Sequence, residues 1–179
     1  RPRLERPLDL ALVLARIFPS LALAIPLAAI FVRIGLYNHP SGAGLVLAHV
    51  LLGLPFAFLV LRSGFAAVPR ELEEAAFLDG ASHWTIFRSL VIPLAMPAIA
   101  SLGIFQFLWV WNDLLVALVF LGGTTPVMTY QISNMVTSHG AGWQLLTAAA
   151  FLSMILPMLV FFGFQRYFVR GMLAGAVKG

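Results

Sequence analysis

Four long apolar stretches constrain the fold of this chain more than any other feature of its sequence. They cover about residues 8–34, 43–61, 97–121 and 145–164. A bilayer core is crossed by about 20 helical residues, so each stretch is long enough to form a transmembrane helix. In lipid, a spanning helix satisfies its own backbone hydrogen bonds. The sequence therefore predicts an all-α, polytopic transmembrane fold with four spans, the first bent at Pro19 and Pro26.

Composition agrees with a membrane protein and excludes several functions. Of the 179 residues, 61% are hydrophobic and 10% are charged, whereas a soluble domain has about 25% charged residues. The net charge of +4 is small, so we expect contact with membrane lipid and none with nucleic acid. With no cysteine and no pair of histidines at metal spacing, we expect no metal. The chain also has no Gly-rich lysine loop and no nucleophile–base set, so it is not predicted to be an enzyme.

The basic residues predict the orientation in the membrane. The loops around residues 35–42 and 122–144 contain no Lys or Arg, whereas the two ends and the loop after the second span are basic, with Arg1, Arg3, Arg6, Arg62, Arg70, Arg88, Arg166, Arg170 and Lys178. By the positive-inside rule, both ends and residues 63–92 face the cytoplasm. Arg16 and Arg33 lie within or at the outer end of the first span. The 122–144 loop contains a segment, 128–135, that is amphipathic enough for a short interfacial helix.

Residues 69–93 form the longest polar stretch and predict a helix–turn–helix at the membrane surface. Pro69 has the fixed φ that suits a first helical position. Gly80 is placed to end the first helix in a left-handed conformation. Ser82 can cap a second helix through Leu90, and Pro93 marks its boundary.

Polar residues within the third stretch are candidates for a solute pathway, because intramembrane polar groups are costly and often functional. They are Gln106, Trp111, Asn112 and Asp113. The alternative is an interhelical hydrogen-bond cluster, or an ion pair of Asp113 with Arg16 or Arg33. His49, in the second span, is interpreted as a packing histidine rather than a ligand.

Two segments resemble those of permease subunits from binding-protein-dependent ABC importers. The polar loop is similar to the EAA loop of that family at Glu74, Ala75, Ala76, Asp79, Gly80, Ala81 and Pro93. Leu90 and Ile92 exchange the family's usual isoleucine and leucine. The terminus resembles that of carbohydrate-importer permeases of the maltose and α-glucoside type, in which the tail extends toward the ATPase, at Gly175, Ala176, Val177, Lys178 and Gly179.

The resemblance implies a type I ABC importer permease fold, with residues 1–179 as a single transmembrane permease domain. Such a subunit forms half of a pathway for a sugar or oligosaccharide in the bacterial cytoplasmic (inner) membrane. Its implied partners are ABC ATPase subunits, which bind ATP and magnesium, a second permease subunit and an extracytoplasmic solute-binding protein. The family usually has six spans, so two amino-terminal spans are expected to be missing.

Two other functions remain open at this point. A secondary transporter or channel without an ATPase would not need a docking loop, but often needs an intramembrane carboxylate, for which Asp113 is the candidate. A membrane scaffold without transport activity is the third possibility.

Overall fold

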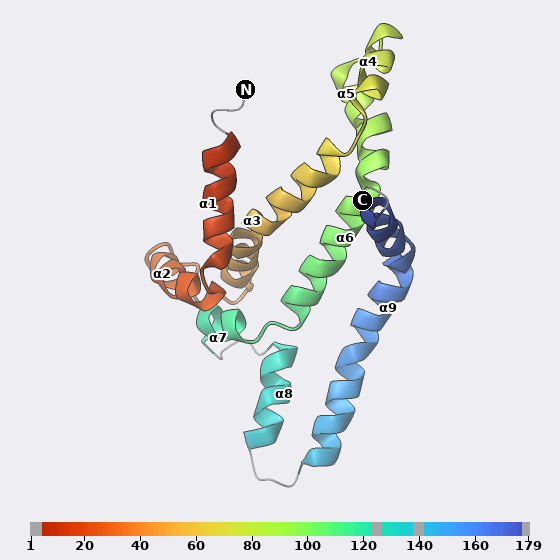
Figure 1. Cartoon of the computed structure of the whole chain (residues 1–179). Coiled ribbons are helices and arrows are strands. Elements are labelled where there is room, and N and C mark those ends of the chain that lie inside the picture. The colour runs from red at the N-terminus through yellow and green to blue at the C-terminus, as the bar shows by residue number, and fades with distance from the viewer. Residues whose placement is uncertain (1–4, 123–126, 138–141, 177–179) are drawn as a thin grey trace. The chain divides into compact units, whose positions relative to one another are not determined.

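The computed structural model describes residues 5–122, 127–137 and 142–176 (Figure 1). Over these ranges the regular structure is helical and contains no strand, which confirms the all-α prediction. Three helical segments are long and apolar enough to cross a membrane: Ala43–Ala66, His83–Trp111 and Trp143–Gln165. The chain divides into two compact units, one of Arg1–Phe56 with Gln106–Val160 and the other of Ala57–Phe105 with Phe161–Gly179.

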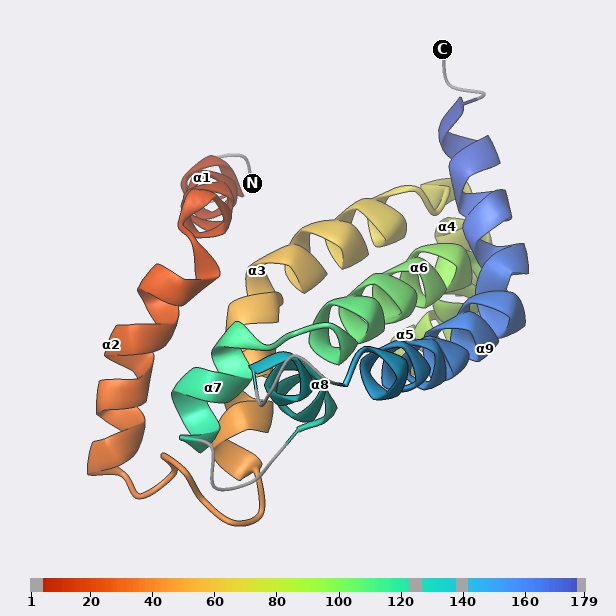
Figure 2. The ribbon, with the colours of Figure 1, turned by 90° about the horizontal axis from the view of Figure 1, so that it is seen from below.

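The first apolar stretch is divided between two helices and is not one bent span, which corrects the prediction. In the first unit, α1 covers Glu5–Ile17 and α2 covers Ser20–Arg33. Pro19 precedes α2 with φ −57° and ψ 131°, an extended conformation that ends helical geometry. Figure 2 shows the change of direction between α1 and α2. Pro26, in contrast, lies inside α2 as expected.

The core of the first unit lies between α2, the first half of α3 (Ala43–Ala66) and α7 (Leu115–Leu121). Small residues let the helices approach, and one aromatic pair fills the remaining space: the ring centroids of Phe31 and Phe120 lie 5.2 Å apart, edge to face. The buried residues of this core are Ala24, Ala28, Phe31, Ala48, Val116 and Phe120. The packing attaches the short helix α7 to α2.

The third apolar stretch is also interrupted. Helix α6 covers Ile92–Trp111 and ends before Asn112, and α7 begins at Leu115, so the continuous helix predicted over 97–121 is wrong. The side-chain amide of Asn112 donates to the Leu108 carbonyl at 2.7 Å, and Asp113 accepts from the first turn of α7. Such side-chain bonds to the backbone compete with helical continuation. Farther along, α8 (Met128–Thr137) confirms the short helix predicted over 128–135.

The second unit contains the polar loop. After α3 come α4 (Arg70–Leu78), α5 (His83–Ile86) and a π-helical turn, η1 (Phe87–Val91), which leads directly into α6. The boundary predicted at Pro93 is therefore absent, and the helix runs through it. Proline lacks the N–H of a regular α turn and its ring crowds the preceding turn. We attribute the wider π turn before Pro93 to this crowding.

Helix α3 approaches α6 closely within the second unit. A Cβ built on Gly64 would collide with the Ala98 Cβ, so the absence of a side chain at Gly64 allows this approach. The rings of Phe65 and Phe87 lie 6.2 Å apart, which attaches α3 to the π-helical turn.

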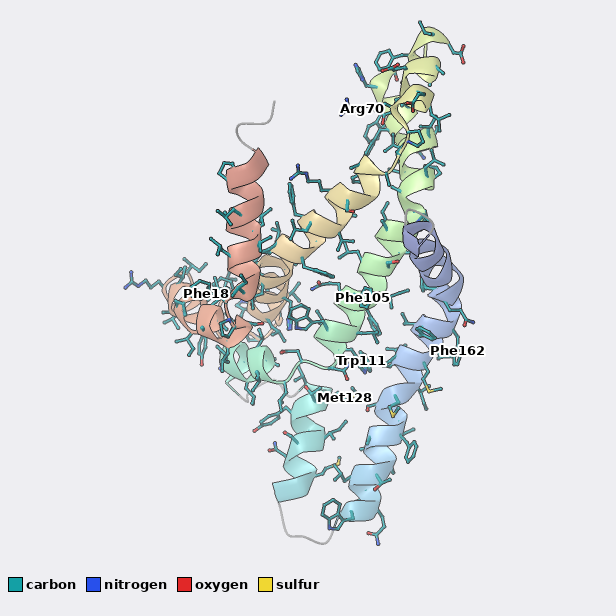
Figure 3. All side chains as sticks on the ribbon, viewed as in Figure 1. Phe18, Arg70, Phe105, Trp111, Met128 and Phe162 are labelled. Atoms are coloured by element: carbon teal, nitrogen blue, oxygen red, sulfur yellow. The ribbon has the colours of Figure 1, made fainter. Side chains whose placement is uncertain are left out.

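Helix α9 covers Trp143–Ala176 and includes the stretch predicted over 145–164. Pro157 lies inside it. In the apolar window of this helix no residue is buried, and Phe162, labelled in Figure 3, is 54% exposed. A long apolar helix with exposed side chains is suited to contact with lipid or with another membrane subunit.

Candidate functional site

The predicted helix–turn–helix is present in the second unit, with its first helix starting one residue later than expected. Pro69 has φ −63° and ψ 130°, so it precedes α4 and Arg70 is the first helical residue. Glu71 and Glu73 lie in the first turn, where the helix dipole favours negative charge.

The turn between α4 and α5 has the geometry of a Schellman motif. Gly80 has φ +82°, which confirms its left-handed conformation. Its N–H donates to the Phe77 carbonyl at 3.0 Å, and the N–H of Ala81 donates to the Ala76 carbonyl at 3.0 Å. These bonds satisfy carbonyls at the end of α4 that the helix itself leaves free. Asp79 is the last residue before the turn.

Ser82 begins the second helix, as predicted. Its hydroxyl oxygen accepts from the N–H of Thr85 at 3.2 Å and lies 2.8 Å from the Thr85 hydroxyl. The ring of Phe77 contacts the ring of His83 edge to face, with centroids 4.4 Å apart. The turn is therefore held from both of its ends.

The helix–turn–helix exposes apolar side chains although the segment is polar. Leu78 is 90% exposed, Trp84 68% and Phe77 47%. Glu74 and Ala75 are exposed, Ala76 is half-buried, and no residue of α4 is buried. We name Leu78 and Trp84, with the exposed faces of Glu74 and Ala75, the α4–α5 surface. Exposed apolar groups beside charged ones are typical of a protein contact.

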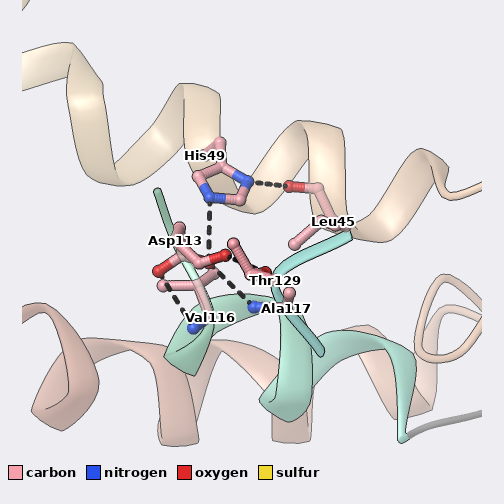
Figure 4. Close-up of polar contacts among 6 residues, drawn as sticks. All are labelled: Leu45, His49, Asp113, Val116, Ala117 and Thr129. Carbon is pink, nitrogen blue, oxygen red and sulfur yellow. Dashed lines mark hydrogen bonds and ion pairs between the residues drawn. The ribbon is translucent and has the colours of Figure 1, made fainter. Parts of the chain in front are cut away.

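In the first unit, Asp113 joins three elements at the turn between α6 and α7 (Figure 4). Its carboxylate accepts from the N–H groups of Val116 at 3.3 Å and Ala117 at 3.0 Å, so it caps α7 from the residue before Leu114. Its Oδ2 lies 3.3 Å from Nε2 of His49 on α3, and its backbone carbonyl accepts from the Thr129 hydroxyl of α8 at 2.7 Å.

These contacts correct the ion pair considered from the sequence. Among the described side chains, the ionic partner of Asp113 is His49 and not Arg33; the Arg16 side chain lies outside the described residues. His49 packs as expected, but it also belongs to the polar cluster. No local sequence pattern indicates this pair. In contrast, the position of Asp113 shortly before an apolar run is a pattern that predicts a helix cap.

The other three pathway candidates lie around the same turn with different contacts. The indole N–H of Trp111 donates to the Ser153 carbonyl of α9 at 3.0 Å, and Asn112 is exposed. Gln106 lines a small pocket with His49 and Gly53, and its Oε1 is buried without a hydrogen-bond partner. A Cβ on Gly53 would lie 2.5 Å from Nε2 of Gln106, so the glycine makes room for the amide.

The terminal candidates are described only in part. Gly175 and Ala176 are the last residues of α9, and Val177, Lys178 and Gly179 lie outside the described residues. Within the part of the chain that the structure describes, no three His, Cys, Asp or Glu residues gather as metal ligands.

Comparison with known proteins places the chain among transport permeases. Residues 1–174 match the family described as "Binding-protein-dependent transport system inner membrane component". The chain is 55% identical over 164 residues to the "Osmoprotective compounds uptake permease protein GgtD" of Synechocystis, covering 90% of this chain and 54% of that protein. It is 48% identical over 160 residues to the "Alpha-glucoside transport system permease protein AglG" of Rhizobium meliloti, covering 87% and 42%.

A third relative extends the comparison to another sugar. The chain is 36% identical over 173 residues to the "Trehalose transport system permease protein SugB" of Mycobacterium tuberculosis, covering 94% of this chain and 62% of that protein. The chain thus spans about half the length of the first two relatives. The comparisons give no support to a secondary transporter or channel. Its sequence and all-helical fold together establish that the chain belongs to the family of binding-protein-dependent transport system inner membrane components.

Proposed function

We propose that this chain is part of a permease subunit of an ATP-driven importer and forms half of the pathway for a sugar or oligosaccharide. Its partners would be ABC ATPase subunits, a second permease subunit and an extracytoplasmic solute-binding protein. ATP and magnesium would bind in the ATPase subunits. Family membership supports the transport role, and the names of the α-glucoside and trehalose relatives support a sugar as the solute.

The observation on which the coupling role depends is the α4–α5 surface. Glu74, Ala75, Ala76, Asp79, Gly80, Ala81 and Pro93 would form or orient the contact with the ATPase. Leu78 and Trp84 are exposed beside charged residues, and burying them against a partner would remove apolar area from water. The small side chains of Ala75 and Ala76 allow a close approach. In the tail, Gly175 to Gly179 would extend toward the same partner.

The polar residues of the first unit are proposed to line or shape the pathway. Asn112 is exposed at the end of α6, and the buried Oε1 of Gln106 can accept a hydrogen bond. Trp111 and Asp113 bond to groups of other helices, whereas the Asn112 amide bonds the Leu108 carbonyl one turn earlier in its own helix. We therefore propose that Gln106 and Asn112 meet the solute, while Trp111 and Asp113 fix the shape of the turn.

Replacing Gly80 tests the coupling role. No atom lies within 4 Å of a Cβ built on Gly80, and its φ is +82°, so Gly80→Val acts through backbone strain of about 1 kcal/mol or more. In the reconstituted full-length complex, we expect Gly80→Val to lower both permease-stimulated ATP hydrolysis and uptake. Gly80→Asn is the matched control, because asparagine tolerates the left-handed conformation. Normal hydrolysis and uptake in Gly80→Val would refute the assignment.

Cysteine labelling tests the orientation. We propose that both ends of the chain and residues 63–92 are cytoplasmic and that 35–42 and 122–144 face outward, from the distribution of Lys and Arg. The 179 residues contain no cysteine, so a cysteine introduced at Ser82 or at Ser138 is the one thiol among them that the reagent can label. An impermeant reagent added outside intact cells should label Ser138→Cys and not Ser82→Cys. Labelling of both positions from one side would contradict this orientation.

A further inference from the structure

We infer that the small pocket beside Gln106 is a subsite for one hydroxyl group of a neutral solute, and that it rejects a quaternary ammonium solute. The inference rests on the proposed function and deepens it, because it assigns the chemical class of the solute. The residues that line this pocket come from α2, α3, α6 and α7. All of them belong to the first unit, so the pocket lies within one compact part of the chain.

The pocket contains a buried acceptor that has no donor. Oε1 of Gln106 is buried and accepts no hydrogen bond within the described residues. An amide oxygen has two lone pairs, and leaving a buried acceptor unsatisfied costs about 1–3 kcal/mol. A ligand that donates an O–H or N–H group to Oε1 recovers this cost. The first requirement on a ligand of this pocket is therefore a hydrogen-bond donor.

A glycine on the facing helix makes room for the Gln106 amide. Gly53 is buried in α3, and a Cβ built on it would lie 2.5 Å from Nε2 and 3.0 Å from Oε1 of Gln106. A larger residue at this position would displace the amide. Glycine within a helix costs about 0.5–1 kcal/mol relative to alanine, so the helix is less stable here than it would be with alanine. In return, the amide lies at the edge of the pocket.

The other lining groups suit a hydroxyl on a carbon skeleton. Ser20 adds a hydroxyl at the start of α2, Trp109 adds an indole ring, and the side chains of Leu52 and Val116 are apolar. The empty space is about 260 Å³ and includes open solvent, whereas pockets for whole small molecules usually have about 300–1,000 Å³. The pocket therefore has room for one part of a solute, such as a hydroxyl with its carbon, and not for a whole disaccharide.

The charges around the pocket disfavour a cation. Among the described lining residues there is no Asp, Glu, Lys or Arg. His49 also lines the pocket, and the carboxylate that contacts it, that of Asp113, already accepts from two backbone N–H groups of α7. A quaternary ammonium group has neither O–H nor N–H, so it would leave Oε1 of Gln106 unpaired. Sites with unpaired buried polar groups reject such ligands strongly.

This distinction bears on the relatives, because their names allow more than one class of solute. One relative is named for osmoprotective compounds, and two others are named for an α-glucoside and for trehalose. A sugar or another polyol offers the hydroxyl that the pocket requires. The lining thus favours the hydroxyl-bearing class.

Protection of a single cysteine tests the subsite in the full-length importer complex, made free of other cysteines. Ser20→Cys places a thiol in the pocket lining, and its labelling by a small methanethiosulfonate is timed with maltose, trehalose or glycine betaine, and with no solute. We expect at least one of the two sugars to slow labelling and glycine betaine to leave the rate unchanged. Ser41→Cys is the control, because Ser41 is exposed between α2 and α3, and its labelling rate should be the same throughout.

Three results of this experiment would overturn the inference. Equal labelling with and without both sugars would mean that water, and not the solute, fills the pocket. Protection by glycine betaine would assign the wrong chemical class. A thiol at residue 20 that never reacts would show that the pocket is closed to solutes.

Two changes at the amide test the acceptor itself. Gln106→Leu keeps roughly the same volume and removes the acceptor, so the sugar concentration that gives half-protection should rise about two- to tenfold, as for the loss of one neutral hydrogen bond. Gly53→Ala displaces the amide and should act in the same direction, which provides a second test if Gln106→Leu does not assemble. Gly103→Ala is its control, because nothing lies within 4 Å of a Cβ built there. Unchanged half-protection in an assembled Gln106→Leu complex would overturn the inference.

Uptake by the wild-type complex separates failure of this inference from failure of the proposed function. If the complex imports maltose or trehalose while neither sugar protects Ser20→Cys, the sugar pathway stands and the subsite is wrong. If the complex imports glycine betaine and neither sugar, the proposed sugar function is wrong as well.

Discussion

The turns at α4–α5 and at α6–α7 differ in where their stabilising contacts come from. At the α4–α5 turn, the bonds join residues that are close in sequence, such as Ala81 to Ala76 and Thr85 to Ser82. At the α6–α7 turn, Asp113 and Trp111 bond to side chains and carbonyls of α3, α8 and α9. Both turns use an oxygen side chain to cap the helix that follows. One turn is specified locally, and the other depends on distant parts of the chain.

This difference has a mechanical consequence. A turn that satisfies its own backbone groups keeps its shape when its surroundings change, which suits a surface that meets a partner. A turn held by three other helices has a shape that changes when those helices move. The α4–α5 turn is thus suited to transmit a displacement as a rigid unit, and the α6–α7 turn to respond to one.

The largest effect is expected from Asp113→Ala. This change removes the cap of α7 and the carboxylate that faces Nε2 of His49. Losing a cap costs about 1 kcal/mol and leaving a buried polar group unpaired costs about 1–3 kcal/mol, so the free energy of unfolding in detergent should fall by about the sum of the two. Asp113→Asn is the matched variant and should lose less, since asparagine caps a helix about as well as aspartate.

Equal losses in Asp113→Ala and Asp113→Asn would show that the charge, and not the cap, holds the turn. A loss below about 1 kcal/mol in Asp113→Ala, the value typical of a single cap, would contradict the distinction between the two turns. The α6–α7 turn would then be as locally determined as the α4–α5 turn.

A smaller effect is expected from Gly44→Ala, which tests the packing of the first turn of α3 against the loop before it. A Cβ on Gly44 would collide with the backbone carbonyl of Leu36, and a backbone group cannot move aside as a flexible side chain can. Overpacking of this kind costs about 1–3 kcal/mol. Gly103→Ala is the control, since nothing lies within 4 Å of its built Cβ. It should raise stability by about 0.5–1 kcal/mol through helix propensity.

Thermal unfolding of the full-length protein in detergent compares the two glycine variants. If Gly44→Ala and Gly103→Ala shift the midpoint in the same direction, the close approach at Gly44 does not constrain the fold. Opposite shifts would separate the cost of a collision with the backbone at Gly44 from the gain in helix propensity at Gly103.

The same difference explains how much of the fold was predictable from the sequence. The left-handed Gly80 and the Ser82 cap depend on residues within a few positions, so the sequence predicts them correctly. Of the four predicted spans, three correspond to membrane-length helices in the described residues, and the first does not. The pairing of His49 with Asp113 joins residues far apart in sequence, and no local pattern indicates it.

The sequence did not predict the two helix interruptions, at Pro19 and at Asn112, for a related reason. Long apolar segments flank Pro19 and the Asn112–Asp113 pair on both sides, so the apolar pattern predicts unbroken spans in both places. A proline can bend a transmembrane helix or end it, and the outcome depends on the tertiary contacts around it. At Pro93 the opposite happened, because a π-helical turn accommodates the proline and the helix continues.

The smallest effect is expected from Ser82→Ala, at the locally specified turn. Losing an exposed cap costs about 1 kcal/mol, and nothing distant bonds to the Ser82 hydroxyl among its described contacts. The loss should therefore be confined to α5. Hydrogen exchange at the Thr85 amide, which donates to Ser82, should speed up by about fivefold. Amides of α7 should keep their wild-type exchange rates. The control is Ser89→Ala, which changes another exposed serine, and in this variant the Thr85 amide should keep its wild-type rate. Faster exchange that extends from α5 into α7 would mean that the α4–α5 turn also depends on distant packing, and the distinction between the two turns would be lost.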